Sequence, residues 1–292
     1  MQQQRPFKQI DVFTATPYRG NPLAVVLDGT GLSTETMQEF TNWTNLSEAT
    51  FLLPPTAEGR AAGADYRVRI FCPGRELPFA GHPTLGSCHA WLQAGGQPQV
   101  AGKVVQECGV GLVTLRRDGD RLAFAAPPLI KGGPLAEDDV ALIARGLGVD
   151  RSDILHHAWC DNGPNWRGVM LRSSEQVLAL QPDASILGKL DVGVVGPRGK
   201  VGVVGSTDTD GIAFEVRAFF PGNNGLTEDP VTGSLNAALA QWLIGAGLAP
   251  AQYVAAQGTC LGRAGRVFVE KEGGTIWIGG SSVTCVSGEV LL

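Results

Sequence analysis

The sequence lacks an excess of basic residues. Its 292 residues include 23 Lys and Arg against 28 Asp and Glu, which gives a net charge of −5. Proteins that bind nucleic acid carry a basic patch, and proteins that bind anionic membranes carry a basic cluster beside an amphipathic stretch. The sequence contains neither pattern, so we expect no nucleic acid and no membrane among its partners.

Long hydrophobic runs and paired-cysteine motifs are also missing. No window approaches the ~18 uninterrupted apolar residues that a membrane-spanning helix needs. The amino terminus, Met-Gln-Gln-Gln-Arg-Pro-Phe, has no apolar core of the kind found in secretory signals. The six cysteines include no Cys-x-x-Cys motif and no His at zinc-finger spacing. We therefore expect a cytoplasmic protein with reduced, mostly buried thiols and no bound metal.

The composition is that of an ordinary packed protein, with 43% hydrophobic and 17% charged residues. At ~150 residues per domain, the length predicts about two domains. The stretch 126–134 is rich in Pro and Gly and is the best boundary candidate. We predict halves at residues 1–126 and 127–292, and we leave open whether the C-terminal strand returns to the first half.

Periodicity and turn residues predict strands and helices in both halves. Ser33 is typical of an N-cap, and it precedes a predicted helix over residues 34–43. Further helices are predicted over 83–93, where most residues are small, and over 235–248. Alternating and continuous apolar runs predict strands that include 9–14, 23–27, 48–53, 64–71, 201–204 and 212–220.

An internal repeat is the most informative structural feature. The segment Val68-Arg-Ile-Phe-Cys-Pro-Gly74 returns 148 positions later as Val216-Arg-Ala-Phe-Phe-Pro-Gly222. Each copy is a predicted strand that ends in Pro-Gly and leads through a loop into a helix of small residues. Two copies of one such unit indicate two similar domains, whose equivalent helix starts would face each other across a cleft.

Two facing helix starts form a natural anion site. A helix N-terminus offers unpaired N–H groups and about half a positive charge, and Gly lets a ligand approach the backbone closely. Such starts favour a carboxylate or a developing enolate oxygen. The first start supplies Gly81 and His82, and the second supplies Asp229, Gly233 and Ser234.

Each polar candidate has a plainer alternative. His82, which precedes Pro83, could be a turn residue, Asp229 could form an Asx turn, and Ser234 could be only a helix cap. Glu48 heads a predicted apolar strand, where a carboxylate is either an exposed strand end or a base in an apolar pocket. Glycine-rich segments lack the strand–G-x-G-x-x-G–helix context, and no Walker-type Lys follows one, so no nucleotide cofactor is predicted.

Four segments together resemble the PhzF family of phenazine-biosynthesis isomerases, which belongs to the diaminopimelate epimerase-like fold superfamily. They are Asp11-Val-Phe-Thr with Arg19-Gly-Asn-Pro-Leu-Ala-Val-Val26, Asn45-Leu-Ser-Glu-Ala-Thr-Phe51, Phe79-Ala-Gly-His-Pro-Thr-Leu-Gly86 and Glu228-Asp-Pro-Val-Thr-Gly-Ser234. The resemblance implies an α+β fold of two pseudo-symmetric domains, each a β-barrel-like sheet around a central helix. It also implies a homodimer.

The resemblance also implies a reaction. The best-known family activity isomerises trans-2,3-dihydro-3-hydroxyanthranilate without metal or organic cofactor, by moving a proton between carbons in the interdomain cleft. By motif, Glu48 corresponds to the family's catalytic acid/base. We assign His82 and Asp229 as partner acid/base groups, and Gly81, Gly233 and Ser234 as ligands of the substrate carboxylate or oxyanion.

Two physical expectations accompany this assignment. Burial in an apolar pocket would raise the pKa of Glu48 toward that of a useful base. Neither helix start offers a thiol, which disfavours the two-cysteine racemase chemistry of other superfamily members. An epimerase or racemase acting on an amino-acid derivative by other groups, or a binding protein without catalysis, remain the alternatives.

Overall fold

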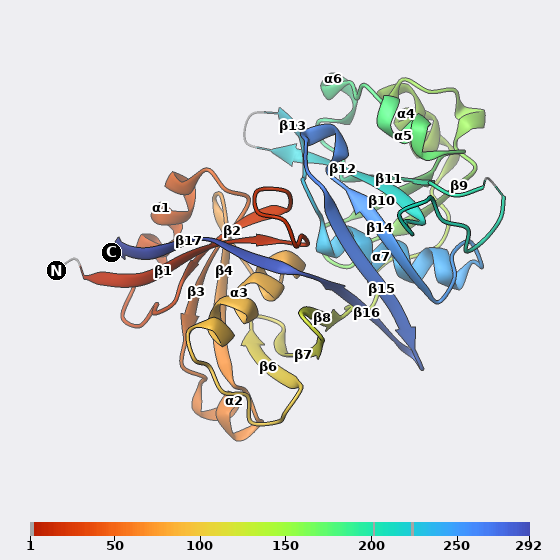
Figure 1. The fold of residues 1–292 in the computed structure, drawn as a ribbon. Helices are drawn as coiled ribbons and strands as arrows, with labels where there is room; N and C mark the ends of the chain where they lie inside the picture. The colour runs from red at the N-terminus through yellow and green to blue at the C-terminus, as the bar shows by residue number, and fades with distance from the viewer. Residues whose placement is uncertain (1–2, 201, 223–224) are drawn as a thin grey trace. The chain divides into compact units, whose positions relative to one another are not determined.

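The computed structural model describes residues 3–200, 202–222 and 225–292. The chain forms two compact units (Figure 1). Unit 1 comprises Met1–Ala125 and Gly279–Leu292, and unit 2 comprises Ala126–Ile278. The C-terminal strand β17 (Ser282–Leu291) lies in unit 1, where it pairs antiparallel with β1 (Gln4–Val12) from Val12↔Ser282 to Gln4↔Leu291.

Unit 1 wraps strands around one central helix, α3 (Gly81–Gln93). This helix contacts β1, β2, β3, β6, β8 and β17, and every residue from Gly81 to Cys88 is buried. A Cβ at Gly86 would lie 2.6 Å from Leu23 and 2.9 Å from Val12, so only glycine allows this close helix–strand packing. The remaining elements are β2 (Asn21–Val26), α1 (Thr34–Thr44), β3 (Ala49–Leu53), α2 (Ala57–Ala61), β4 (Tyr66–Cys72), β5 (Arg75–Leu77), β6 (Lys103–Cys108), β7 (Gly111–Asp118) and β8 (Arg121–Ala125).

Unit 2 is built in the same way around α7 (Gly233–Gly245), which is buried over most of its length and contacts β9 and β15. Its other elements are α4 (Glu137–Leu147), η1 (Arg151–Asp153), β9 (His156–Cys160), β10 (Trp166–Met170), α5 (Ser174–Ala179), α6 (Ala184–Leu187), β11 (Val192–Pro197), β12 (Phe214–Gly222), β13 (Gly225–Glu228), β14 (Gln252–Gln257), η2 (Thr259–Leu261) and β15 (Gly265–Glu272). Strand β16 (Thr275–Gly280) spans the end of unit 2 and the return to unit 1.

The repeat seen in the sequence extends to the pairing of strands. In unit 1, β4 runs antiparallel to β3 and parallel to β6. In unit 2, β12 likewise runs antiparallel to β11 and parallel to β14. The register also repeats, because Ala49 lies opposite Phe71 and Val192 lies opposite Phe219, 148 positions after Phe71. The predicted α+β class, with a sheet around a central helix in each half, is confirmed.

Several element boundaries match the sequence prediction and some do not. Helix α1 begins after Ser33, whose side chain accepts a hydrogen bond from the Thr36 N–H, as an N-cap should. Helices α3 and α7 begin at Gly81 and Gly233, the helix starts inferred from the repeat, and two residues before the ranges 83–93 and 235–248. The strand predicted over 201–204 is wrong for residues 202–204, which lie in turns and irregular chain; residue 201 lies outside the described residues.

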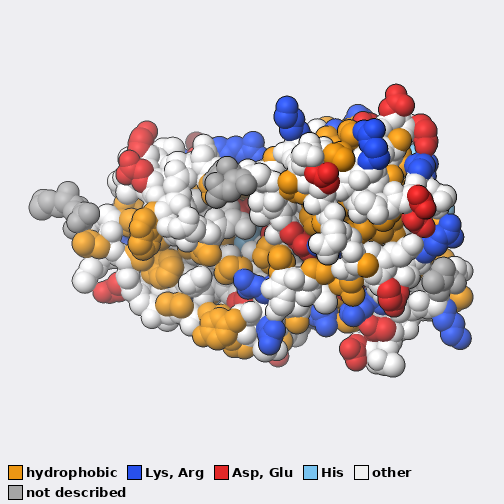
Figure 2. Space-filling view, turned by 90° about the horizontal axis from the view of Figure 1, so that it is seen from above, with side chains coloured by type: hydrophobic (Ala, Val, Ile, Leu, Met, Phe, Trp, Pro, Cys, Tyr) orange, Lys and Arg blue, Asp and Glu red, His pale blue; other side chains and the backbone are white. Residues whose placement is uncertain are grey.

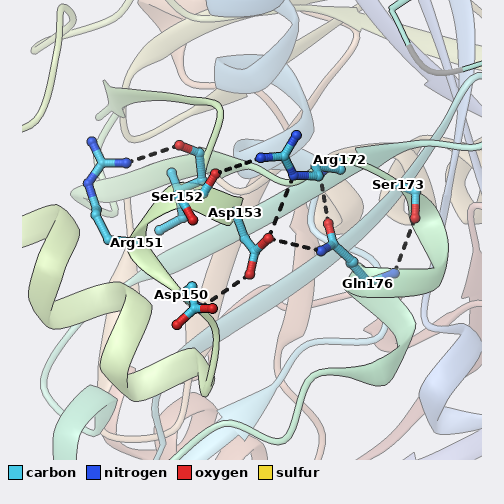
Figure 3. A network of polar contacts seen from close by, with 8 residues as sticks. Asp150, Arg151, Ser152, Asp153, Arg172, Ser173 and Gln176 are labelled. Atoms are coloured by element: carbon cyan, nitrogen blue, oxygen red, sulfur yellow. Dashed lines mark hydrogen bonds and ion pairs between the residues drawn. The ribbon is translucent and has the colours of Figure 1, made fainter.

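Surface and capping interactions are of ordinary kinds. In unit 2, Asp150 and Asp153 form a capping box at η1, and Gln176 links Asp153 to the start of α5 (Figure 3). Acidic and basic side chains are interspersed on the face seen in Figure 2.

Among the described residues, no helix is both long and apolar enough to cross a membrane. All six cysteines are described, and all are free thiols.

Candidate active site

Glu48 stands at the junction between α1 and β3 in unit 1. Helix α1 ends at a left-handed C-cap, Asn45, with φ of 55°, and the chain then turns directly into β3. Glu48 immediately precedes this strand, which lies between β2 and β4. Its side chain is 17% exposed, so the carboxylate is largely but not fully withdrawn from water. The sequence left two alternatives for Glu48, an exposed strand end or a base in an apolar pocket. Its burial favours the second.

His82 is the second residue of α3 and brings its ring to Glu48. Its Nδ1 lies 3.6 Å from Oε2 of Glu48 and 3.5 Å from Nδ2 of Asn21. Burial lowers the pKa of His82 to about 3, and a backbone hydrogen bond at Pro22 opposes this only in part. The imidazole is therefore neutral near pH 7, so its contact with Glu48 is not an ion pair.

The loop before β2 holds Asn21 in this group. The carboxylate of Asp11 accepts hydrogen bonds from the N–H groups of Arg19, at 2.7 Å, and Gly20, at 3.0 Å. A Cβ at Gly20 would lie 2.1 Å from the Val12 carbonyl oxygen, so the turn requires glycine. Asn21 and Asp11 belong to the segments of the family resemblance, but no sequence pattern predicts that Asn21 lies next to His82.

Cys72 ends β4 on the same side of unit 1. Burial raises the pKa of its thiol, and the negative charge of Glu48 adds to the rise. The thiol is therefore protonated at neutral pH and is a poor base. It does not change the conclusion that the helix starts carry no reactive cysteine.

In unit 2, a buried polar network shapes the loop that leads into α7. Thr232 donates its hydroxyl to Oδ2 of Asp229 at 2.6 Å. Gln257 of β14 donates to the Asp229 carbonyl at 3.1 Å and to the Thr232 hydroxyl at 2.9 Å, and it accepts from Asn236 at 2.8 Å. Gln257 and Asn236 are 0% and 2% exposed. The network fixes the backbone and the carboxylate of Asp229 ahead of the helix.

Ser234 is the second residue of α7, the position that His82 occupies in α3. Its Oγ accepts a hydrogen bond from the indole N–H of Trp166 at 3.2 Å, and its carbonyl accepts one from Asn162 at 2.8 Å. It is not an N-cap, because Thr232 occupies that position. The N-cap residues of α3 and α7, Ala80 and Thr232, provide no side-chain cap, unlike Ser33 in α1. Both starts therefore keep backbone N–H groups of the kind that bind anions.

The structure thus places the predicted residues in two half-sites. Glu48, Gly81 and His82 lie together in unit 1, and Asp229, Gly233 and Ser234 lie together in unit 2. That both half-sites serve one substrate stays a prediction. Trp166 and Gln257 were not predicted from the sequence, because they lie on strands distant in sequence and match no motif. Within the described residues, no group of His, Cys, Asp and Glu is arranged to hold a metal ion.

A model of the PhzC–PhzF family, described as phenazine biosynthesis-like protein, matches residues 10–288. The chain belongs to this family. A relative from Schizosaccharomyces pombe named antisense-enhancing sequence 1 is 35% identical and covers 97% of each chain. The trans-2,3-dihydro-3-hydroxyanthranilate isomerase of Pseudomonas aeruginosa is 34% identical over 90% of this chain and 89% of its own. Further PhzF relatives are also named isomerases, and the chain is an isomerase of this family.

Solved structures agree on the fold. The structure of a predicted epimerase from Pseudomonas aeruginosa is 26% identical, covers 98% of this chain and 99% of its own, and superposes with a TM-score of 0.76. A hydroxyproline epimerase from Agrobacterium vitis, solved with bound trans-4-hydroxy-L-proline, is 13% identical with a TM-score of 0.55, over 99% of this chain and 93% of its own. The second likeness shows a shared fold alone.

Proposed function

We propose that the protein moves a proton between two carbons of a small carboxylate substrate by acid/base catalysis without a cofactor. Glu48 takes the proton from one carbon and returns it to another, so that the reaction is an isomerisation with no net redox change. A substrate like trans-2,3-dihydro-3-hydroxyanthranilate is supported by the name of the 34% identical relative.

The observation that carries the proposal is the pair formed by Glu48 and His82. A carboxylate that is 17% exposed lies 3.6 Å from a buried imidazole whose pKa is about 3. Because the ring is neutral near pH 7, it places no positive charge beside Glu48 that would lower the basicity of this side chain. His82 then orients the substrate or relays a proton in its neutral form.

Unit 2 supplies groups suited to binding charge. The uncapped start of α7, with Gly233 first and the hydroxyl of Ser234 second, favours a carboxylate or an oxygen that becomes negative during proton transfer. Asp229, held by Thr232, serves as the second acid/base group. Gly81 plays the part of Gly233 at the start of α3.

An epimerase acting on an amino-acid derivative is the second candidate. The 26% identical structure is titled a predicted epimerase, which favours this reading. Neither helix start carries Cys, however: the second residues are His82 and Ser234. Such an epimerase would have to invert the α-carbon of its substrate with Glu48, His82 or Asp229 rather than with two thiols.

The test is incorporation of solvent deuterium, followed by NMR, over a panel of dihydrohydroxyanthranilate-like and amino-acid substrates. We expect deuterium at a ring carbon of trans-2,3-dihydro-3-hydroxyanthranilate, and a loss of about 10²–10⁴-fold in Glu48→Gln, the range for removal of a general base. Glu58→Gln, at an exposed residue of α2, is the matched control and should keep full exchange. Exchange at an α-carbon with inversion would favour the epimerase. Binding without exchange would indicate a non-catalytic relative, and retained turnover in Glu48→Gln would overturn the role of Glu48.

A further inference from the structure

Trp166 contacts the proposed substrate-binding serine and has no role in the function proposed so far. It is the first residue of β10, its side chain is buried, and its residue is 3% exposed. Its indole Nε1 lies 3.2 Å from Oγ of Ser234. The contact joins a strand to the second residue of α7, 68 positions away in sequence.

The chemistry of the two groups fixes the direction of this hydrogen bond. An indole N–H only donates, so the Ser234 oxygen must accept. A serine hydroxyl has one proton, and that proton must then point away from the indole, toward another acceptor. Trp166 therefore makes Ser234 a hydrogen-bond donor at a helix start that already favours anions.

A second tie comes from the loop between β9 and β10. Asn162 donates from Nδ2 to the Ser234 carbonyl at 2.8 Å. The loop itself is held by Asp161, whose Oδ1 accepts from the N–H groups of Gly163 at 2.9 Å and Asn165 at 3.2 Å. The backbone and the hydroxyl of Ser234 are thus both set by the same segment of chain.

Unit 1 contains a similar contact. Asn21, the first residue of β2, places Nδ2 3.5 Å from Nδ1 of His82, the second residue of α3. Strands β2 and β10 have the same place in the two repeats, since each runs parallel to the next strand, β3 or β11. The two units therefore share an arrangement: a side-chain nitrogen of the first residue of β2 or β10 contacts the side chain of the second residue of α3 or α7.

We propose that Trp166 is a positioning residue that orients the Ser234 hydroxyl as a donor to the carboxylate of the substrate. This inference rests on the proposed function only in taking the ligand to be a carboxylate. Loss of the indole N–H would let the hydroxyl rotate and would weaken carboxylate binding. Phe removes this N–H and keeps a smaller aromatic ring at the buried position.

The experiment measures binding of anthranilate, and of its neutral amide 2-aminobenzamide, to the wild type and to Trp166→Phe, Ser234→Ala and the double variant. We expect Trp166→Phe to weaken anthranilate binding roughly three- to tenfold, the range of one net hydrogen bond. Binding of 2-aminobenzamide should change less. The double variant should bind anthranilate as Ser234→Ala does, because Trp166 acts through Ser234. Trp159→Phe, at a ring that lies against Lys131 and Arg167, is the control and should bind as the wild type.

A measurement without ligand complements the binding series. The Trp166 indole resonance in a ¹H–¹⁵N spectrum is the one that disappears in Trp166→Phe, and it should shift in Ser234→Ala. An unshifted resonance, a Trp166→Phe variant that binds anthranilate as the wild type does, or multiplicative losses in the double variant would each overturn the proposal. So would a wild type that fails to bind anthranilate. If these tests succeed but no deuterium enters trans-2,3-dihydro-3-hydroxyanthranilate, the proposed reaction fails and the positioning role stands.

Discussion

At the scale of single residues, the buried His82 and the partly buried His89 give the folded protein a pH-dependent stability. Burial lowers the pKa of His82 from 6.5 to about 3 and that of His89 from 6.5 to about 4. Below pH 6.5 the unfolded chain binds protons at these residues and the folded protein does not. The free energy of unfolding therefore falls as pH drops from about 6.5 until the folded pKa of each residue is reached. Above pH 6.5 the two histidines cause no such loss of stability.

This behaviour can be tested with His82→Asn. Each histidine contributes at most about 1.4 kcal/mol per pH unit within its window. Between pH 6.5 and pH 5 the wild type should lose up to about 2 kcal/mol of unfolding free energy through His82, and His82→Asn should lack that part of the loss. Urea unfolding at pH 7 and pH 5 measures both values. An equal pH dependence in the two proteins would show that His82 is not held neutral by the fold.

Gly20 is the residue at which backbone packing and the candidate site meet most closely. A Cβ there would lie 2.1 Å from the Val12 carbonyl oxygen and 2.9 Å from Oδ1 of Asp11, which holds the turn. Gly20→Ala must shift the turn that carries Asn21 to His82, and we expect a loss of about 1–3 kcal/mol in unfolding free energy, as for other overpacked sites. Gly245→Ala, at a glycine with no atom within 4 Å of its Cβ position, is the control. Equal stability of the two variants would contradict the packing argument.

At the scale of elements, each half contains the same ion pair across the hairpin that leads to its central helix. Arg69 binds Glu76 through Nε at 2.8 Å and Nη2 at 2.6 Å. Arg217 binds Glu228 through the same atoms at 3.0 and 2.7 Å. The two guanidinium groups lie 5.0 and 4.9 Å from the ring centroids of the aromatic residues two positions further along each strand. The repeated geometry fixes the two hairpins, β4–β5 and β12–β13, in the same way.

The two pairs differ in burial, which predicts different energies. The side chains of Arg217 and Glu228 are 7% and 11% exposed, against 19% and 39% for Arg69 and Glu76. Removing one partner of a buried pair leaves an uncompensated charge and costs about 3–5 kcal/mol, while an exposed pair contributes about 0–1 kcal/mol. Arg217→Gln should therefore destabilise the protein far more than Arg69→Gln in chemical denaturation at pH 7. Similar losses would mean that burial does not set the energy of these pairs.

The elements also show where local sequence signals are sufficient. Ser33 predicted the start of α1 because a capping side chain acts within three residues. The repeat indicated the starts of α3 and α7, whereas the ranges 83–93 and 235–248 begin two residues late, because Gly81 and Gly233 follow N-cap residues that provide no side-chain cap. The strand expected over 201–204 was inferred from its valines alone, yet Val203 and Val204 are 54% and 57% exposed, and Gly202 has a φ of 76°. Val203 and Val204 therefore lie in an exposed stretch of turns and irregular chain instead of a strand.

At the scale of the whole molecule, the duplication was predictable and the contacts that hold the site were not. A seven-residue repeat was enough to predict two similar halves, because a shared strand–loop–helix unit implies shared packing. The pairing of Glu48 with His82 followed from the family resemblance and not from spacing. Gln257 and Trp166 reach Thr232 and Ser234 from strands that only the three-dimensional fold brings near, so one sequence without coordinates carries no signal for them.

The return of β17 makes unit 1 discontinuous in sequence, and this predicts how it can be isolated. Strand β1 depends on β17 for one of its two neighbours, and the other is β2. The chain ends lie side by side, since the Gln3 N–H donates to the Leu292 carbonyl at 2.6 Å and the Leu292 N–H donates to Gln3 at 3.0 Å. A short linker could therefore join residue 292 to residue 3 without strain.

We expect a polypeptide of residues 3–125 to fold poorly, because it exposes an edge of β1 and uncovers the part of α3 that β17 contacts. A permuted polypeptide, residues 279–292 followed by a Gly-Gly linker and residues 3–125, should fold cooperatively and show dispersed amide resonances. The hydrogen bond between the His89 ring and Thr284, at 3.2 Å, offers a local reporter, because it forms only when β17 is seated on α3. Thermal unfolding by circular dichroism compares the two polypeptides. A cooperative transition at the same temperature in both would show that unit 1 does not need its C-terminal strand.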